Sequence, residues 1–308
     1  MRSGWLRIAQ AVVGLAIVWF AARTLIHNWD QLRSQPLEWQ LKPGWLALSL
    51  GLTWSMYALL ILAWRGILAS WGQRLDGWSA ARIWVLSSLG KYLPGKVWAV
   101  AGMAVLSQRA GVAPWAATGS AVVMQVLAIG TGAAVAGVAG SHLLESASPG
   151  VSTALVLLVV GSIVSVGLLL WPPVLRGLLR LAAPQAAGER QPTGRGIIIG
   201  ILANTVAWLG YGLGLWLLAR GVLPQSGLGL RLALTAFTAS YLAGFLALFA
   251  PGGIGVREGL FILMLQQPLG IATATSLALA SRLLLTVAEL GAAVPFLAFQ
   301  RRQARVPS

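Results

Sequence analysis

The sequence contains no cysteine, only two histidines and few charged side chains, which make up 9% of its 308 residues. A soluble domain carries about 25% charged residues, so this chain has too few of them to cover a surface that faces water. Without cysteine there is no disulfide, thiolate metal ligand or cysteine nucleophile. His27 and His142 lie at the ends of apolar segments and leave little for a metal cluster. We therefore expect neither a soluble enzyme nor a bound cofactor.

Long apolar runs take the place of the missing charge: 57% of the residues are hydrophobic and the mean hydropathy is +0.79. Six runs are long enough to cross a bilayer as helices, namely 6–26, 45–69, 114–139, 151–171, 195–219 and 271–299. The charged start of the first run is typical of a signal peptide, but more membrane segments follow it, so we expect an uncleaved helix. The predicted fold class is an all-α polytopic membrane protein.

Two further apolar runs, 78–109 and 230–268, are interrupted near the middle by Pro94-Gly95 and by Pro251-Gly252-Gly253. Proline lacks an amide donor and clashes with the preceding turn, and glycine accepts the backbone angles of a reversal. Each half is too short for a comfortable crossing of its own. We expect two re-entrant hairpins that enter the membrane and return to the same side.

Positive charge tests this layout, because the chain carries 22 Lys and Arg against 7 Asp and Glu, a net charge of +15. With six crossings, thirteen arginines fall on the side of the N-terminus and four cations on the other: Arg2, Arg7, Arg65, Arg74, Arg82, Arg109, Arg176, Arg180, Arg190, Arg195, Arg301, Arg302 and Arg305 against Arg33, Lys42, Arg220 and Arg231. Cytoplasmic loops collect Lys and Arg, so we expect both termini in the cytoplasm of a plasma (inner) membrane protein, with 301–308 as a basic tail. A topology with eight crossings, in which both interrupted runs span the membrane, also places the two termini on the same side and is the alternative. No basic run is long enough to follow a nucleic acid, which we exclude as a partner.

The order helix, helix, hairpin, helix occurs in residues 1–140 and again in 141–300. Three crossings in each unit make the second unit inverted relative to the first. Inverted repeats whose broken helices meet at the midplane are typical of transporters, with the substrate site at the repeat interface. The alternative is a coincidence of two Pro-Gly turns.

The first interruption is flanked by two of the three lysines in the chain, Lys91 and Lys96. Lys96 falls in the first turn of the returning half-helix, where free amides and the helix dipole favour an anion. Lys91, Pro94, Gly95 and Lys96 are therefore candidate ligands of a phosphate. The alternative is that both lysines reach to lipid headgroups from a shallow turn.

The second interruption is rich in glycine and precedes Arg257 and Glu258. The glycines allow a close backbone approach, and Arg257 offers a planar fork for a carboxylate or phosphate. Glu258 either neutralises Arg257 or caps the half-helix. The candidate binding residues here are Pro251, Gly252, Gly253, Gly255 and Arg257.

The last helix carries Arg282 and Glu289 in an otherwise apolar stretch, two turns apart and on one face. Intramembrane charges are costly and find partners inside the protein. We expect Arg282 to pair with Glu258, and Glu289 to pair with Lys96 or Arg257. Such pairs either fix the packing or act as a gate or proton-coupling element.

At these motifs the sequence resembles the flippase-like integral membrane family that includes the transmembrane part of lysylphosphatidylglycerol synthases. The resemblance rests on the segments 90–98 and 250–259 and on Ser281-Arg282 with Glu289, and it extends from about residue 5 to 300. It implies a bacterial or archaeal inner-membrane protein that handles anionic or isoprenoid-linked lipids, alongside enzymes of surface-glycan or lipid synthesis. The soluble aminoacyl-transfer domain of the synthase branch has no counterpart before Ser308, so we do not expect that chemistry.

The leading hypothesis is a translocase whose substrate is an anionic or isoprenoid-phosphate-linked lipid, with the phosphate held by Lys91, Lys96 and Arg257 between the two interruptions. A second hypothesis is a membrane scaffold for a synthesis enzyme. A lipid-modifying enzyme ranks last, because Glu258 and Glu289 are the only carboxylates predicted inside the membrane.

Overall fold

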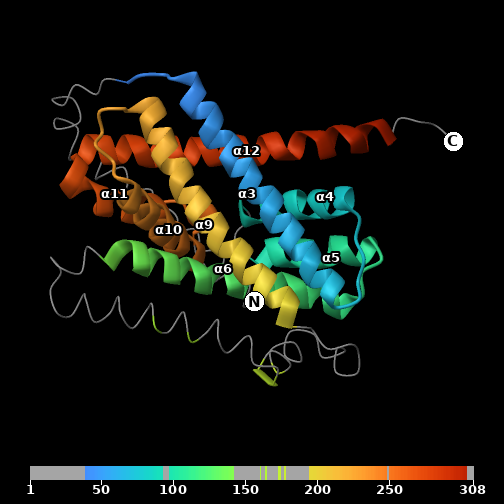
Figure 1. Cartoon of the computed structure of the whole chain (residues 1–308). Helices are drawn as coiled ribbons and strands as arrows, with labels where there is room; N and C mark the ends of the chain where they lie inside the picture. Colours follow the sequence, from blue (N-terminus) through green and yellow to red (C-terminus); the bar gives the residue numbers. More distant parts are fainter. Residues whose placement is uncertain are drawn as a thin grey trace, which may run out of the picture.

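The computed structural model describes residues 39–92, 97–141, 194–247 and 250–303, together with residues 160, 164, 173, 174 and 177. All regular structure in these ranges is helical (Figure 1). The elements are α3 (Pro43–Ser70), α4 (Gly77–Ser88), η1 (Leu89–Tyr92), α5 (Val97–Arg109), α6 (Pro114–Ala139), α9 (Gly194–Val222), α10 (Leu230–Leu246), η4 (Pro251–Gly253), α11 (Val256–Leu269) and α12 (Ile271–Gln303).

Four of these helices are long and apolar enough to cross a membrane: α3, α6, α9 and α12 as far as Phe296. They agree with four of the six predicted crossings, so the all-helical membrane fold class is confirmed. The other two predicted crossings, 6–26 and 151–171, lie outside the described residues. Leu202, Leu283 and Val294 are each more than 60% exposed on these helices, as expected for side chains whose solvent is lipid.

The helix starts follow local chemistry. Pro43 and Pro114 stand in the first turn of α3 and α6, where the missing amide of proline costs no hydrogen bond. Asp76 caps α4 by accepting a 2.9 Å hydrogen bond from the backbone N–H of Ser79. The Ser79 hydroxyl, and then its amide, hold the pKa of Asp76 below its usual value by stabilising the carboxylate.

Both interrupted runs form two helices that pack against each other, α4 with α5 and α10 with α11. The interruptions themselves, η1 and η4, are in contact although they lie far apart in the sequence. The breaks of the two halves therefore meet at one place, behind the long diagonal pair of α3 and α9 that Figure 1 shows.

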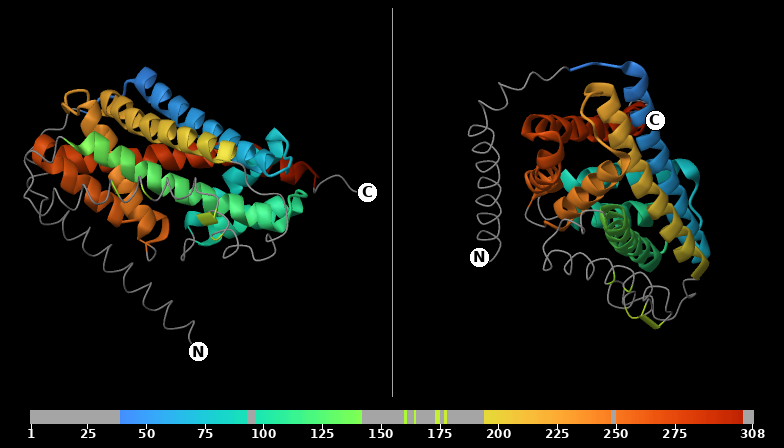
Figure 2. Two further views of the ribbon diagram at one scale, coloured as in Figure 1. Left: turned by 60° about the horizontal axis from the view of Figure 1, so that its bottom comes forward. Right: turned by 60° about the vertical axis from the view of Figure 1, so that its left-hand side comes forward.

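The helix contacts have an internal symmetry. Exchanging α3 with α9, α4 with α10, α5 with α11 and α6 with α12 turns every pair of helices in contact into another such pair. The pair α6 and α10 becomes α12 and α4, for example, and α6 and α9 becomes α12 and α3. Only the pair of α3 and α9 is converted into itself, and these two helices run side by side in both views of Figure 2.

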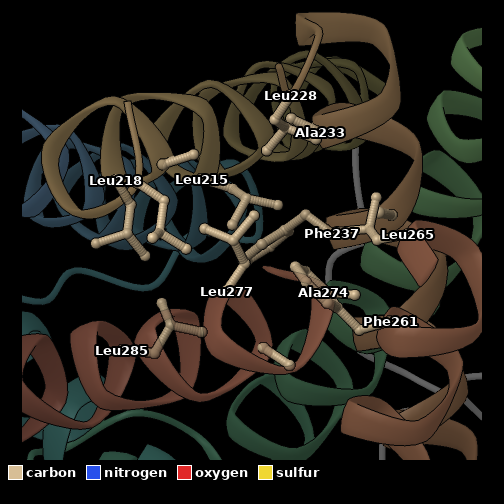
Figure 3. Packing of buried hydrophobic residues seen from close by; sticks show 14 of the residues in the cluster. Leu215, Leu218, Leu228, Ala233, Phe237, Phe261, Leu265, Ala274, Leu277 and Leu285 are labelled. Atoms are coloured by element: carbon tan, nitrogen blue, oxygen red, sulfur yellow. The ribbon is translucent and has the colours of Figure 1, made fainter. Parts of the chain in front are cut away.

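Two large apolar clusters and a small third one around Val85, Ala293 and Phe296 form the core. One contains Trp64, Trp71 and Trp115 from α3 and α6, and the rings of Trp71 and Trp115 stack with their centroids 5.7 Å apart. The other joins α9, α10, α11 and α12 around Phe237 and Phe261 (Figure 3).

Candidate functional site

The first break begins where α4 tightens into η1. Gly90 lies so close to α5 that a Cβ atom there would be 2.8 Å from the backbone nitrogen of Ala99, so only glycine allows this approach. Lys91 and Tyr92 follow it in η1. The predicted ligands Pro94, Gly95 and Lys96 lie outside the described residues.

The second break is built from glycines with left-handed backbones, and the φ angles of Gly252, Gly253 and Gly255 are +58°, +72° and +84°. Gly253 also packs on the backbone of α10, because a Cβ atom there would lie 2.9 Å from the Cα of Gly244. Pro251 starts η4. The glycine-rich segment is thus a close crossing of two backbones, which presents Arg257 from the first turn of α11.

Glu258 and Arg282 tie α12 to this break. Glu258 accepts a 2.8 Å hydrogen bond from the backbone N–H of Gly255 and so caps α11. Arg282 lies 3.2 Å from the carboxylate of Glu258 and donates a 2.9 Å hydrogen bond to the carbonyl of Gly252. The expected pair of Arg282 and Glu258 is present, and the capping role suggested for Glu258 is the one observed.

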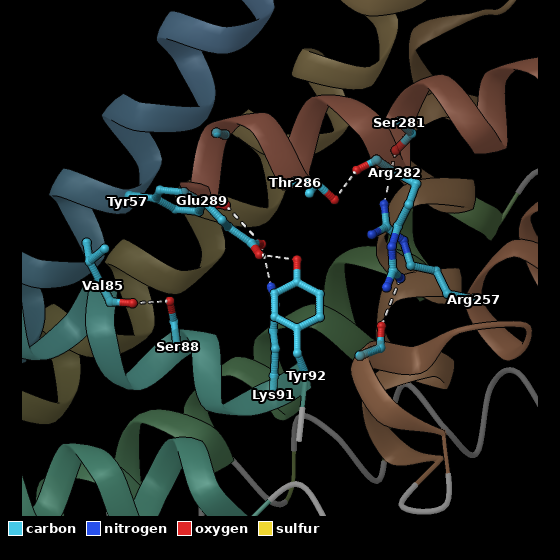
Figure 4. Close-up of polar contacts among 12 residues, drawn as sticks. Tyr57, Val85, Ser88, Lys91, Tyr92, Arg257, Ser281, Arg282, Thr286 and Glu289 are labelled. Carbon is cyan, nitrogen blue, oxygen red and sulfur yellow. Dashed lines mark hydrogen bonds and ion pairs between the residues drawn. The ribbon is translucent and has the colours of Figure 1, made fainter. Parts of the chain in front are cut away.

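Glu289 does not pair with Arg257, and its other expected partner, Lys96, lies outside the described residues. Its carboxylate pairs with Lys91 and accepts hydrogen bonds from Tyr92 (2.6 Å) and Tyr57 (3.4 Å) (Figure 4). The side chain is only 6% exposed. Two turns along α12 separate it from Arg282, and this places it beside the first break rather than beside Arg257. The two tyrosines were not predicted as ligands, because nothing in the sequence relates Tyr57 on α3 to α12.

Arg257 differs from the other cations of this cluster in its partners. It is 6% exposed, and its guanidinium donates a 3.0 Å hydrogen bond to the hydroxyl of Ser281. It also lies over the rings of Phe237 and Tyr241, at 5.4 and 5.2 Å from their centroids. Among the described residues, no carboxylate oxygen lies within 4.0 Å of it.

Two adjacent cavities lie at this place. The smaller, about 70 Å³, is lined by Lys91 from the first break, Gly252 and Gly253 from the second, and Arg257, Arg282 and Glu289. The larger, about 210 Å³, extends between α3, α4, α6, α9 and α10. Both are lined by Lys91, Gln125, Tyr241 and Glu289, so the two cavities lie side by side.

The charges of the cluster do not cancel. Lys91, Arg257 and Arg282 supply three positive charges and Glu258 and Glu289 two negative ones, which leaves +1 among the described residues. A buried cation without a partner is costly, and a bound anion would remove that cost. The described residues contain no group of three or more His, Asp or Glu that could hold a metal ion. The arrangement therefore suits an anion with one negative charge.

Comparison with protein families identifies the family of the chain. Residues 7–290 match a protein-family model described as the lysylphosphatidylglycerol synthase TM region, so the match covers most of the chain. No curated protein sequence matches significantly.

Proposed function

Because the chain belongs to the lysylphosphatidylglycerol synthase transmembrane-region family, we propose that it moves an anionic, phosphate-bearing lipid from one membrane leaflet to the other. The family relates the chain to membrane lipids and their modification, and translocation is the step that we add. In this proposal the chain binds and moves the lipid, including isoprenoid-phosphate-linked lipids as candidates, and does not modify it covalently.

The observation that carries the proposal is the buried guanidinium of Arg257. It faces the smaller cavity and has only a hydroxyl and two aromatic rings around it among the described residues. Arginine presents a planar fork that matches a phosphate, and such charge-assisted hydrogen bonds are the strong ones. A phosphodiester at this position would neutralise the remaining +1 charge of the cluster.

The surrounding groups suit the same ligand. The first turn of α11 brings free backbone amides and the positive end of the helix dipole to the cavity. Lys91 lies across the cavity and can turn from Glu289 toward a phosphate. We place Lys96 at the start of α5 in the same role, together with the turn of Pro94 and Gly95.

We propose that the two halves are inverted repeats and that α4–α5 and α10–α11 are re-entrant hairpins entering from opposite leaflets. The exchange symmetry of the helix contacts and the meeting of η1 with η4 support this arrangement. Movement of one half against the other would then open the site to each leaflet in turn. Lys91 and Arg282 would act as the gate by leaving their carboxylate partners and binding the phosphate instead.

The arginine distribution supports cytoplasmic termini in a plasma (inner) membrane, where enzymes of glycan or lipid synthesis would supply or use the lipid. Because the sequence contains no cysteine, labelling of single introduced cysteines can test this orientation without background labelling. In intact cells, a membrane-impermeant maleimide should label Ser226→Cys between α9 and α10 and leave Ser308→Cys unlabelled until the cells are opened. The reverse pattern would overturn the orientation.

Lipid binding tests the site itself. We would measure binding of phosphatidylmethanol, the simplest monoanionic phosphodiester lipid, and of phosphatidylcholine to the purified chain by native mass spectrometry. We expect Arg257→Met to weaken phosphatidylmethanol binding at least about tenfold, with Arg257→Lys intermediate. Arg220→Met is the matched control, because Arg220 is exposed at the end of α9 over the ring of Trp216.

Equal binding of both lipids, unchanged by Arg257→Met, would remove the anion site. The scaffold hypothesis would then explain the family membership better, because a scaffold needs no internal anion site.

A further inference from the structure

The larger cavity contains polar groups that the protein leaves unused. Gln125, Tyr211 and Tyr241 line it, and none of the three side chains has a hydrogen-bond partner among the described residues. All three are half-buried, and polar side chains that face a cavity without a protein partner are available to a ligand or to water there. Three unused groups on the wall of one cavity form a recognition surface.

Much of the rest of the wall is apolar, and several of its side chains are aromatic. Tyr57, Trp84 and Trp208 line the same space, and the rings of Trp208, Tyr211 and Tyr241 are joined by edge-to-face contacts. Within the described residues that line the cavity, the only charged groups are Lys91 and Glu289, which pair with each other. The wall thus offers apolar ring faces together with neutral donors and acceptors.

From this wall we infer that the larger cavity binds the uncharged, hydroxylated part of the lipid headgroup, a polyol or a sugar ring, attached to the phosphate that Arg257 holds. The inference rests on the proposed function, because the phosphate must lie in the smaller cavity. The two cavities share lining residues and are therefore neighbours, so a headgroup whose phosphate lies in the smaller cavity can place its next group toward the larger one.

Two other occupants fit less well. An ammonium group would find aromatic rings, but the one carboxylate that lines the cavity among the described residues is Glu289, which is already neutralised by Lys91 and bonded by two phenols. An acyl chain would leave the amide of Gln125 and the hydroxyls of Tyr211 and Tyr241 buried without partners. A hydroxylated ring satisfies these groups and covers the aromatic faces.

The test compares lipids that differ only beyond the phosphate. Phosphatidylinositol carries a hydroxylated ring, phosphatidylmethanol has the same single charge without hydroxyls, and phosphatidylethanolamine carries an amine. We expect the wild type to bind phosphatidylinositol at least about tenfold more tightly than phosphatidylmethanol, because several neutral hydrogen bonds are gained. Free inositol 1-phosphate at equal concentration should not compete, because the lipid tail anchors the headgroup.

Two variants test which side chains cause the preference for phosphatidylinositol over phosphatidylmethanol. Tyr211→Phe keeps the ring and its packing but removes the hydroxyl, and Gln125→Leu keeps the size. Each should lower the preference for phosphatidylinositol by on the order of threefold to tenfold. Tyr211→Phe should in addition leave phosphatidylmethanol binding unchanged, because Tyr211 lines only the larger cavity. Gln267→Leu is the matched control, because Gln267 is exposed on α11 away from both cavities.

The outcomes separate this inference from the proposed function. Equal binding of phosphatidylinositol and phosphatidylmethanol, with both lost in Arg257→Met, would overturn the inference and keep the anion site. Tighter binding of phosphatidylethanolamine, variants that leave the preference intact, or full competition by inositol 1-phosphate would also overturn the inference alone. Failure of every phosphodiester lipid to bind would overturn both.

Discussion

Replacing Gly253 by alanine tests the crossing of backbones that builds the second break. The substitution has two costs. A left-handed backbone, here with φ of +72°, costs about 1–2 kcal/mol for a residue with a Cβ. That Cβ would also lie 2.9 Å from the Cα and 3.0 Å from the carbonyl carbon of Gly244, and overpacking of this kind costs about 1–3 kcal/mol.

Two other glycines separate these costs. Gly111 also has a positive φ, +86°, but a Cβ there would meet no atom within 4 Å, so Gly111→Ala carries the backbone strain alone. Gly259 lies in α11, without a positive φ and with no atom within 4 Å. Gly259→Ala should therefore be neutral or stabilise the protein by up to about 1 kcal/mol.

Thermal unfolding in detergent, followed by the fluorescence of the fifteen tryptophans, would measure the series. For a chain of this size 1 kcal/mol corresponds to about 2 °C in Tm. We expect Gly111→Ala to lower Tm by about 2–4 °C and Gly253→Ala by about 4–10 °C. A Gly253→Ala protein as stable as Gly111→Ala would refute the close crossing of α10 and the break.

Three further predictions concern the charged groups. Glu289→Gln leaves Lys91, whose side chain is 29% exposed, without its counter-ion, and should cost less than the ~3–5 kcal/mol of a fully buried pair; adding Lys91→Met should restore part of the Tm, and no restoration would contradict the pairing. Glu258→Gln and Arg282→Met should together destabilise by less than the sum of their separate effects, by about 0.5–3 kcal/mol, and strict additivity would argue against their contact. The lowered pKa of Asp76 means that its cap is at full strength above its unfolded-state pKa of about 3.9 and weakens as the pH falls through the lower folded-state value; the Tm of Asp76→Asn measured against the wild type should show this acid-side loss, and a difference that does not depend on pH would contradict it.

The parts of the fold that follow from one-dimensional patterns could be predicted from the sequence. Hydropathy located the crossings at α3, α6, α9 and α12 within a few residues, because length and polarity decide whether a helix spans. Proline and glycine predict both interruptions, because the backbone preferences of these residues act locally. The sequence also predicts the pair of Arg282 and Glu258, because charged residues are rare in these apolar segments and each has few possible partners of opposite charge.

The parts that depend on how helices pack could not be predicted in this way. The sequence predicts Arg257 or Lys96 as the partner of Glu289. Lys96 lies outside the described residues, and the packing of α12 against α3 and α4 gives Glu289 not Arg257 but Lys91 and two tyrosines. The unused polar groups of the larger cavity come from α6, α9 and α10, far apart in the sequence. No periodicity in any one helix indicates that Gln125 and Tyr211 line the same space.

Lipid movement tests the central claim most directly. The purified chain would be placed in phosphatidylcholine vesicles with a trace of phosphatidylglycerol labelled on its acyl chain, and dithionite would quench the label in the outer leaflet. We predict that the wild type and Arg220→Met expose the inner-leaflet label to dithionite, and that Arg257→Met protects it as in vesicles without protein. Transport by Arg257→Met at the wild-type rate, or a wild type no faster than empty vesicles, would contradict a translocase with its anion site at Arg257.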